Sequence, residues 1–108
     1  MTCPFCDEAV SRPKHREASL DIKTGQCSCG ALYVDDETGR SGGEALLAGL
    51  TMLCDGNLDR AMEMVADRDY QLADREYEPR TFTRASRLKG LRAFGRAKVW
   101  FFRRILAS

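Results

Sequence analysis

Four cysteines, arranged as two close pairs near the start of the chain, are the side chains with the clearest chemical potential. Cys3 and Cys6 are separated by two residues, and Cys27 and Cys29 by one. Two tight turns that each present two thiolates can surround one tetrahedral metal ion. Four sulfur ligands close the coordination shell, which is typical of structural zinc. The spacing therefore predicts one structural Zn2+ ion held by Cys3, Cys6, Cys27 and Cys29.

The remaining cysteine and the single histidine are assigned other roles. Cys54 lies on the apolar side of a predicted helix, so we expect it to be a small buried hydrophobic residue. His15 could replace one thiolate, but it lies in a polar run and is expected to be solvated. The sequence offers no recognisable Ser/His/Asp arrangement, and a zinc ion with four thiolates has no position for a nucleophilic water. We therefore expect no enzymatic activity.

The residues between the cysteine pairs predict the β-hairpin that would bring the pairs together. Ala18, Leu20 and Ile22 alternate with polar residues, which is the pattern of a half-buried strand. Thr24-Gly25 is expected to turn the chain, and residues 26–34 to return as a second strand. So small a sheet buries too little apolar surface to fold alone. Metal ligation, which contributes about 10–16 kcal/mol in zinc-finger peptides, can supply the missing stability.

A pair of helices is expected after this hairpin. Ser41 and Glu44 have the spacing of a capping box, and apolar residues follow at helical intervals. Asp55-Gly56 is expected to end the first helix, and Asn57 is a suitable N-cap for the second. The pattern therefore predicts a helical hairpin with a very short connection.

Two further helices are expected in the rest of the chain. The polar segment 67–78 is a candidate third helix that ends before Pro79. Residues 84–106 are typical of an amphipathic helix with one apolar and one basic face. Residues 80–108 hold 9 of the 17 Lys and Arg residues and none of the 16 acids, which favours an anionic partner or docking on the acidic remainder of the chain. The expected nucleic-acid contacts are Lys89, Arg92, Arg96, Lys98, Arg103 and Arg104.

Two families share parts of these patterns. The spacing Cys-x2-Cys-x20-Cys-x-Cys resembles that of the zinc-ribbon superfamily, and the whole chain is similar to small bacterial zinc-ribbon proteins. The resemblance implies two cysteine turns and a β-hairpin around one zinc ion. The chain departs from the family at Cys27-Ser28-Cys29, where a two-residue gap is more common, so the second turn is tighter. Residues 44–66 resemble the last two helices of ubiquitin-associated-like domains, including the one in elongation factor Ts.

Together these patterns predict an α+β protein with three regions, which are a zinc ribbon at 1–38, a helical hairpin region at 39–79 and a basic helical tail at 80–108. Neither a secretory signal nor a transmembrane run is recognised, and we expect a cytoplasmic location. The predicted function is a non-enzymatic zinc-binding module that binds nucleic acid or a ribonucleoprotein through its tail. The alternative is a protein-interaction adaptor that uses the helical hairpin and the aromatic cluster Trp100-Phe101-Phe102. A membrane surface is a third candidate partner for the tail, and no small-molecule substrate is expected.

Overall fold

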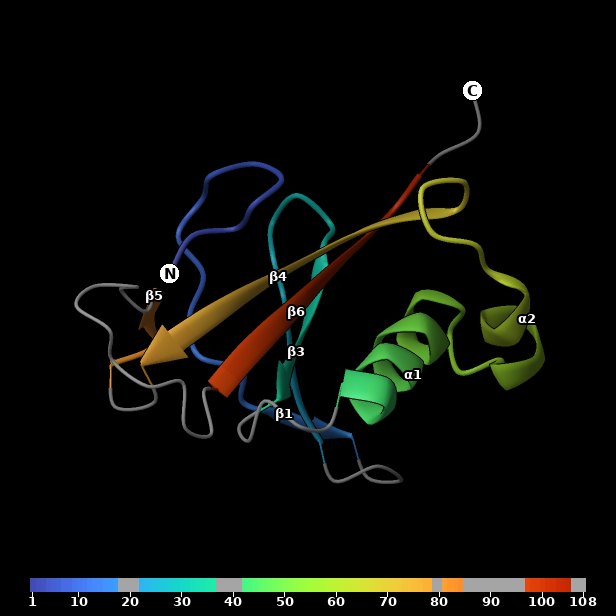
Figure 1. Ribbon diagram of the computed structural model, residues 1–108, viewed down its shortest axis with the longest axis horizontal. Coiled ribbons are helices and arrows are strands. Elements are labelled where there is room, and N and C mark those ends of the chain that lie inside the picture. Colours follow the sequence, from blue (N-terminus) through green and yellow to red (C-terminus); the bar gives the residue numbers. More distant parts are fainter. Residues whose placement is uncertain (18–21, 37–41, 79–80, 85–96, 106–108) are drawn as a thin grey trace, which may run out of the picture.

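The computed structural model describes residues 1–17, 22–36, 42–78, 81–84 and 97–105, and it contains both strands and helices (Figure 1). This mixture confirms the α+β class. The elements are β1 (His15–Glu17), β2 (Ile22–Gln26), β3 (Leu32–Asp36), α1 (Gly42–Leu53), α2 (Leu58–Glu63), β4 (Tyr70–Glu78), β5 (Thr83–Arg84) and β6 (Ala97–Arg104).

One antiparallel sheet, with the strand order β1-β2-β3-β6-β4-β5, connects segments from the beginning and the end of the chain (Figure 1). The last strand, β6, lies between β3 and β4. Trp100 is opposite Val34 on one side and opposite Asp74 on the other. Strands from all three of the regions predicted from the sequence therefore share one sheet. Over residues 97–104 the basic tail is a central part of the body.

Each face of the sheet has its own apolar cluster, because side chains alternate between the two faces of a strand. On one face, α1 packs over Val34 and Phe102. On the other face, the N-terminal loop that carries the first cysteine pair packs near Tyr33, Val99 and Phe101. Figure 1 shows α1 in green and this loop in blue, well separated from one another. The two cysteine pairs therefore belong to the sheet face opposite α1.

The predicted helical pair is confirmed. The residues after α1, Asp55 and Gly56, have φ angles of 54° and 88°, in the left-handed region that ends a helix. Asn57 caps α2, because its side-chain oxygen accepts a hydrogen bond from the Arg60 N–H at 3.1 Å. The Ser41 half of the predicted capping box lies outside the described residues.

The helices predicted over 67–78 and 84–106 are wrong where the structure describes those residues. Residues 70–78 form β4 and residues 97–104 form β6. The two strands pair over eight register positions, so their backbone groups are satisfied in the sheet. A strand that is buried on both faces has an almost continuous apolar run, which periodicity alone does not distinguish from a buried helix. Residues 85–96 lie outside the described part of the chain.

The turn predicted at Thr24 and Gly25 is misplaced, because both residues lie within β2. The chain turns at residues 27–30 instead. Gly25 is opposite Tyr33, and a Cβ atom at position 25 would lie 2.4 Å from Cζ of the Tyr33 ring. The glycine therefore marks a close approach of the tyrosine ring to the strand. Residues 18–21 of the predicted first strand lie outside the described residues.

Gly49 marks the closest approach of α1 to the sheet. A Cβ atom at this position would lie 2.2 Å from Cε1 of Phe102, whose ring is fully buried. Overpacking a core destabilises a protein by about 1–3 kcal/mol, whereas alanine favours a helix over glycine by about 1 kcal/mol. At so short a distance the clash is the larger effect. We therefore expect Gly49→Ala to lower the free energy of unfolding by about 1–2 kcal/mol in urea titrations.

The matched control for this prediction is Gly43→Ala. Gly43 is also in α1, it is exposed, and a Cβ atom there would meet no atom within 4 Å. This variant should be as stable as the parent chain or slightly more so. Equal stability of the two variants would show that α1 does not approach Phe102 as closely as described.

Candidate metal centre

Two tight turns present the two cysteine pairs. In the first, the Asp7 N–H donates to the Cys3 carbonyl at 2.9 Å, and in the second the Gly30 N–H donates to the Cys27 carbonyl at 2.9 Å. Both turns end in a residue with positive φ, at 64° for Asp7 and 97° for Gly30. Glycine adopts this conformation without a steric cost, and aspartate tolerates it better than most residues. The backbone can therefore curl back after each pair.

Further backbone hydrogen bonds hold each turn in place. The Cys3 N–H donates to the Glu8 carbonyl at 2.8 Å, and the Cys27 N–H donates to the Ala31 carbonyl at 2.8 Å. The second bond closes the connection between β2 and β3. Both pairs are thus positioned by the backbone, so their geometry depends on the local chain as well as on any bound ion.

The four sulfur atoms all lie within 4.8 Å of one another. Cys3 Sγ is 3.8 Å from Cys29 Sγ, and Cys6 Sγ is 3.5 Å from Cys27 Sγ, so each of these contacts joins the two turns. A tetrahedral centre with Zn–S bonds of about 2.3 Å has S–S edges of about 3.8 Å. The thiols form no disulfide. The donor atoms and their spacing therefore fit one tetrahedral metal ion such as Zn2+.

The cluster has a buried half and a more accessible half. Cys3 is fully buried and Cys27 is only 6% exposed, whereas Cys6 and Cys29 are half-buried. The two buried thiols are members of the apolar cluster around Phe101 on this sheet face. An ion held by all four thiols would therefore fasten the N-terminal loop to the sheet. By contrast, Cys54 is buried beside the Met64 thioether, at 3.3 Å, as a small hydrophobic residue.

The thiols alter one another's ionisation. Burial raises the pKa of Cys3. A hydrogen bond from the Glu8 backbone lowers the pKa of Cys6, but burial and the other three thiols outweigh it and raise the pKa to about 12. Burial raises the pKa of Cys27, yet hydrogen bonds from the Cys29 backbone and the neighbouring thiols outweigh it and lower the pKa to about 7. Such a set cannot ionise completely at neutral pH unless a cation offsets the charge.

Zinc affinity is therefore expected to fall steeply as the pH falls. Because the pKa values of Cys3 and Cys6 are raised, both thiols are protonated at neutral pH without metal, and zinc must displace these protons. The protons of Cys3 and Cys6 alone lower the apparent zinc affinity by about 100-fold for each unit by which the pH falls. The stability that zinc provides is thus present at higher pH and lost on acidification. Competition with a chromogenic zinc chelator across this range measures the effect, and a change below about tenfold per unit contradicts it.

Three of the six predicted nucleic-acid contacts lie in β6, and two of these have contacts with other parts of the protein. Lys98 Nζ is 3.9 Å from Asp74 Oδ2 and 5.6 Å from the centre of the Trp100 ring. The Arg104 guanidinium donates to the Leu53 carbonyl at the end of α1. A cation is favourable there, because the carbonyl groups at a helix C-terminus carry partial negative charge. The other three predicted contacts lie outside the described residues, namely Lys89, Arg92 and Arg96.

Arg103, the third predicted contact in β6, lies on the same sheet face as the thiols. Its guanidinium is 5.9 Å from the centre of the Phe5 ring, in the first cysteine turn. Gln71 of β4 is directly opposite Arg103 in the sheet. Both residues, together with Gly30, line a cavity beside the second cysteine turn. Gln71 and Gly30 were not predicted as site residues, because only the strand register brings Gln71 to Arg103, and no local pattern signals it.

Comparison with protein-family models, curated proteins and solved structures finds no match. The zinc-ribbon and ubiquitin-associated-like resemblances therefore stay predictions from the sequence. Within the described residues, no helix is both long enough and apolar enough to cross a bilayer.

Proposed function

We propose that this chain is a non-enzymatic zinc-binding module in which one Zn2+ ion has a structural role. The observation that carries the proposal is the group of four thiols within 4.8 Å of one another, contributed by two turns that are 20 residues apart in the sequence. Four sulfur ligands fill a tetrahedral shell, so the ion would have no open position for water or a substrate. Reduced thiols of this kind suit the cytoplasm.

Native mass spectrometry of the chain purified without added metal tests this proposal. We expect a mass that corresponds to one zinc ion per chain, and the loss of that mass after acidification. Replacing both Cys6 and Cys29, the two half-buried members, by serine should abolish zinc retention. A folded chain that contains no metal would refute the proposal.

The module is proposed to bind nucleic acid or a ribonucleoprotein. Residues 80–108 hold 9 Lys and Arg residues and no acid, which suits contacts to phosphates. Because Lys98 is paired with Asp74 and Arg104 donates to the Leu53 carbonyl, Arg103 is the residue of β6 best placed for such a contact. The partner would then approach the sheet face that carries the thiols.

Fluorescence anisotropy with a labelled single-stranded RNA, at increasing salt, tests nucleic-acid binding. If the four predicted residues other than Lys98 and Arg104 contact phosphates, log affinity should fall against log salt with a slope of about −3. The affinity would then drop by about 50-fold for a fourfold rise in salt. A slope near −1 would indicate a single phosphate contact. An affinity that does not change with salt concentration would refute the proposal.

The alternative function, a protein-interaction adaptor, is favoured by one observation. Leu58, Met62 and Val65 at and after α2 are 50%, 72% and 47% exposed, which is unusual for apolar residues at helical spacing. The aromatic cluster that was predicted to assist is wrong as a surface, because Phe101 and Phe102 are fully buried. An adaptor would form a complex that persists at high salt and is lost in Met62→Asp.

A further inference from the structure

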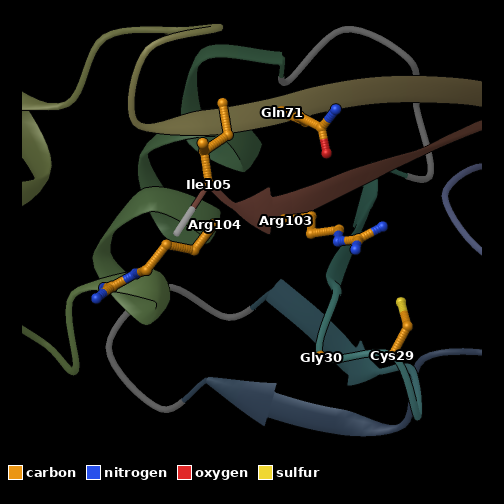
Figure 2. A pocket seen from close by; sticks show the side chains of 6 residues that line it. All are labelled: Cys29, Gly30, Gln71, Arg103, Arg104 and Ile105. Carbon is orange, nitrogen blue, oxygen red and sulfur yellow. The ribbon is translucent and has the colours of Figure 1, made fainter. Parts of the chain in front are cut away.

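A cavity of about 540 Å³ lies between the second cysteine turn and the ends of β4 and β6. Figure 2 shows its six lining residues. Gln71 and Arg103 project to the same side of the sheet as the Cys29 sulfur, whereas Arg104 extends in the opposite direction. The cavity is lined by Cys29, Gly30, Gln71, Arg103, Arg104 and Ile105.

The lining contains two cations and no carboxylate, and these two arginine side chains are the groups that can attract an anion. Arg104 is occupied by the Leu53 carbonyl, which leaves Arg103 as the group that can bind one. Arg103 lies near the Phe5 ring, 5.9 Å from its centre, and a guanidinium positioned by an aromatic ring loses less freedom when it binds a ligand. The planar guanidinium donates paired hydrogen bonds to phosphate oxygens.

A metal ion held by the four thiols would leave a negative centre that opposes an anion in this cavity unless a nearby cation offsets its charge. Four thiolates and one Zn2+ ion would have a formal charge of about −2, which disfavours an anion beside Cys29. A cation on this face offsets part of that charge, and Arg103 supplies one. Among the described residues that line this cavity, Arg103 is therefore the cation on which phosphate binding should depend most.

The size and the remaining lining point to a ligand larger than a phosphate ion. Ligand pockets commonly have volumes of about 300–1,000 Å³, and this cavity is within that range. Gly30 has no side chain, and a Cβ atom there would meet no atom within 4 Å, so a flat ring can approach the backbone. The Gln71 side-chain amide offers both a donor and an acceptor, which suits the edge of a base.

We propose that this cavity binds one nucleotide, with its phosphate on Arg103 and its base between Gly30 and Gln71. The proposal rests on the proposed nucleic-acid function and locates the point at which a strand would be held. A free nucleotide has the same chemistry as a nucleotide within a strand, so the experiment includes both.

The test uses the full zinc-loaded chain with two probes, a single-stranded oligouridylate and uridine monophosphate. Arg103→Gln should weaken oligouridylate binding by about 10-fold or more, because a charge-assisted bidentate contact is lost. It should also reduce the salt slope by about 1. Gln71→Ala, at an exposed side chain, should weaken binding by about 3- to 10-fold.

The matched control is Arg60→Gln, which removes the same charge from an exposed position on α2, outside this cavity. Zinc content and thermal midpoint verify that each variant is folded. The control should change oligouridylate affinity by less than about twofold.

Three outcomes separate the proposals. If Arg103→Gln and Arg60→Gln weaken oligouridylate binding equally, the cavity assignment is overturned and the proposed nucleic-acid function stands. If only uridine monophosphate binds, and Arg103→Gln abolishes it, the cavity assignment is supported and the nucleic-acid function fails. If neither probe binds the zinc-loaded chain, both are refuted.

Discussion

Replacing Cys27 with serine is expected to abolish tight zinc binding and to unfold the chain at physiological temperature. A serine hydroxyl is a poor zinc ligand, so the ion would lose one of its four sulfur donors. Zinc binding contributes about 10–16 kcal/mol to folding in zinc-finger peptides, whereas whole domains are stable by only about 5–15 kcal/mol. The free energy lost with the ion would therefore be larger than the net stability that the rest of the core can provide.

The position of the cysteines in the fold explains why the effect should be global. Cys3 and Cys27 are part of the apolar cluster that covers Tyr33, Val99 and Phe101 on one sheet face. Without the ion, only the apolar contacts of residues such as Met1, Phe5 and Val10 and the backbone hydrogen bonds would hold the N-terminal loop on this face. Side chains of β6 contribute to the apolar clusters on both faces of the sheet. Exposing the cluster on one face should therefore destabilise the whole sheet.

Circular dichroism, with zinc content measured on the same samples, checks this prediction. Chelation of zinc from the parent chain should have the same effect as Cys27→Ser. The matched control is Cys54→Ala, which removes a buried thiol outside the cluster. This variant should keep one zinc ion and remain folded. A Cys27→Ser chain that keeps one zinc ion and the parent melting temperature would contradict a structural role for the ion.

Phe102→Ala is expected to lower the free energy of unfolding by about 3–5 kcal/mol, which is the usual cost of removing a buried aromatic side chain. Phe102 is fully buried in β6, at the centre of the sheet. Its ring contacts α1 at Gly49 and lies 6.3 Å from the Tyr70 ring, measured between ring centres. No neighbour can fill the space without moving α1 or β4.

Urea unfolding measures this loss, and an unchanged dependence on urea concentration would show that two-state behaviour is kept. Met62→Ala is the control, because Met62 is 72% exposed and its truncation should cost less than about 0.5 kcal/mol. Combining Gly49→Ala with Phe102→Ala should cost less than the two changes separately, since the new methyl group then enters the vacated space. A Phe102→Ala loss as small as that of Met62→Ala would contradict the assignment of 97–104 as a central strand.

The group of four thiols was predictable because the signal for it lies in the sequence spacing within each cysteine pair. Cys3 with Cys6, and Cys27 with Cys29, are each close enough in sequence to share one turn, and a tetrahedral ion then accounts for both pairs. The helix pair was predictable for the same reason, since Gly56 supplies a left-handed stop and Asn57 a side-chain cap within a few residues. No distant contact is needed to interpret these signals.

The strands of the second half were not predictable in this way. Residues 70–78 include one glutamine and four charged side chains, and their strand conformation depends on pairing with residues 97–104. The pairing partners are far apart in the sequence, so no local window contains both. Residues 97–104 also fitted a helical projection, because the four consecutive apolar residues 99–102 show no alternation that would reveal a strand.

The amino-acid sequence by itself determined the two cysteine pairs, the helix pair and the concentration of basic residues towards the C-terminus. Only the tertiary structure decided that β6 inserts between β3 and β4, which buries Phe101 and Phe102 and places Arg103 beside Gln71 and the second cysteine turn. The physical reason is the range of the interactions. Ligand spacing, caps and charge are properties of neighbouring residues, whereas strand pairing and burial are set by segments that meet only when the whole chain folds.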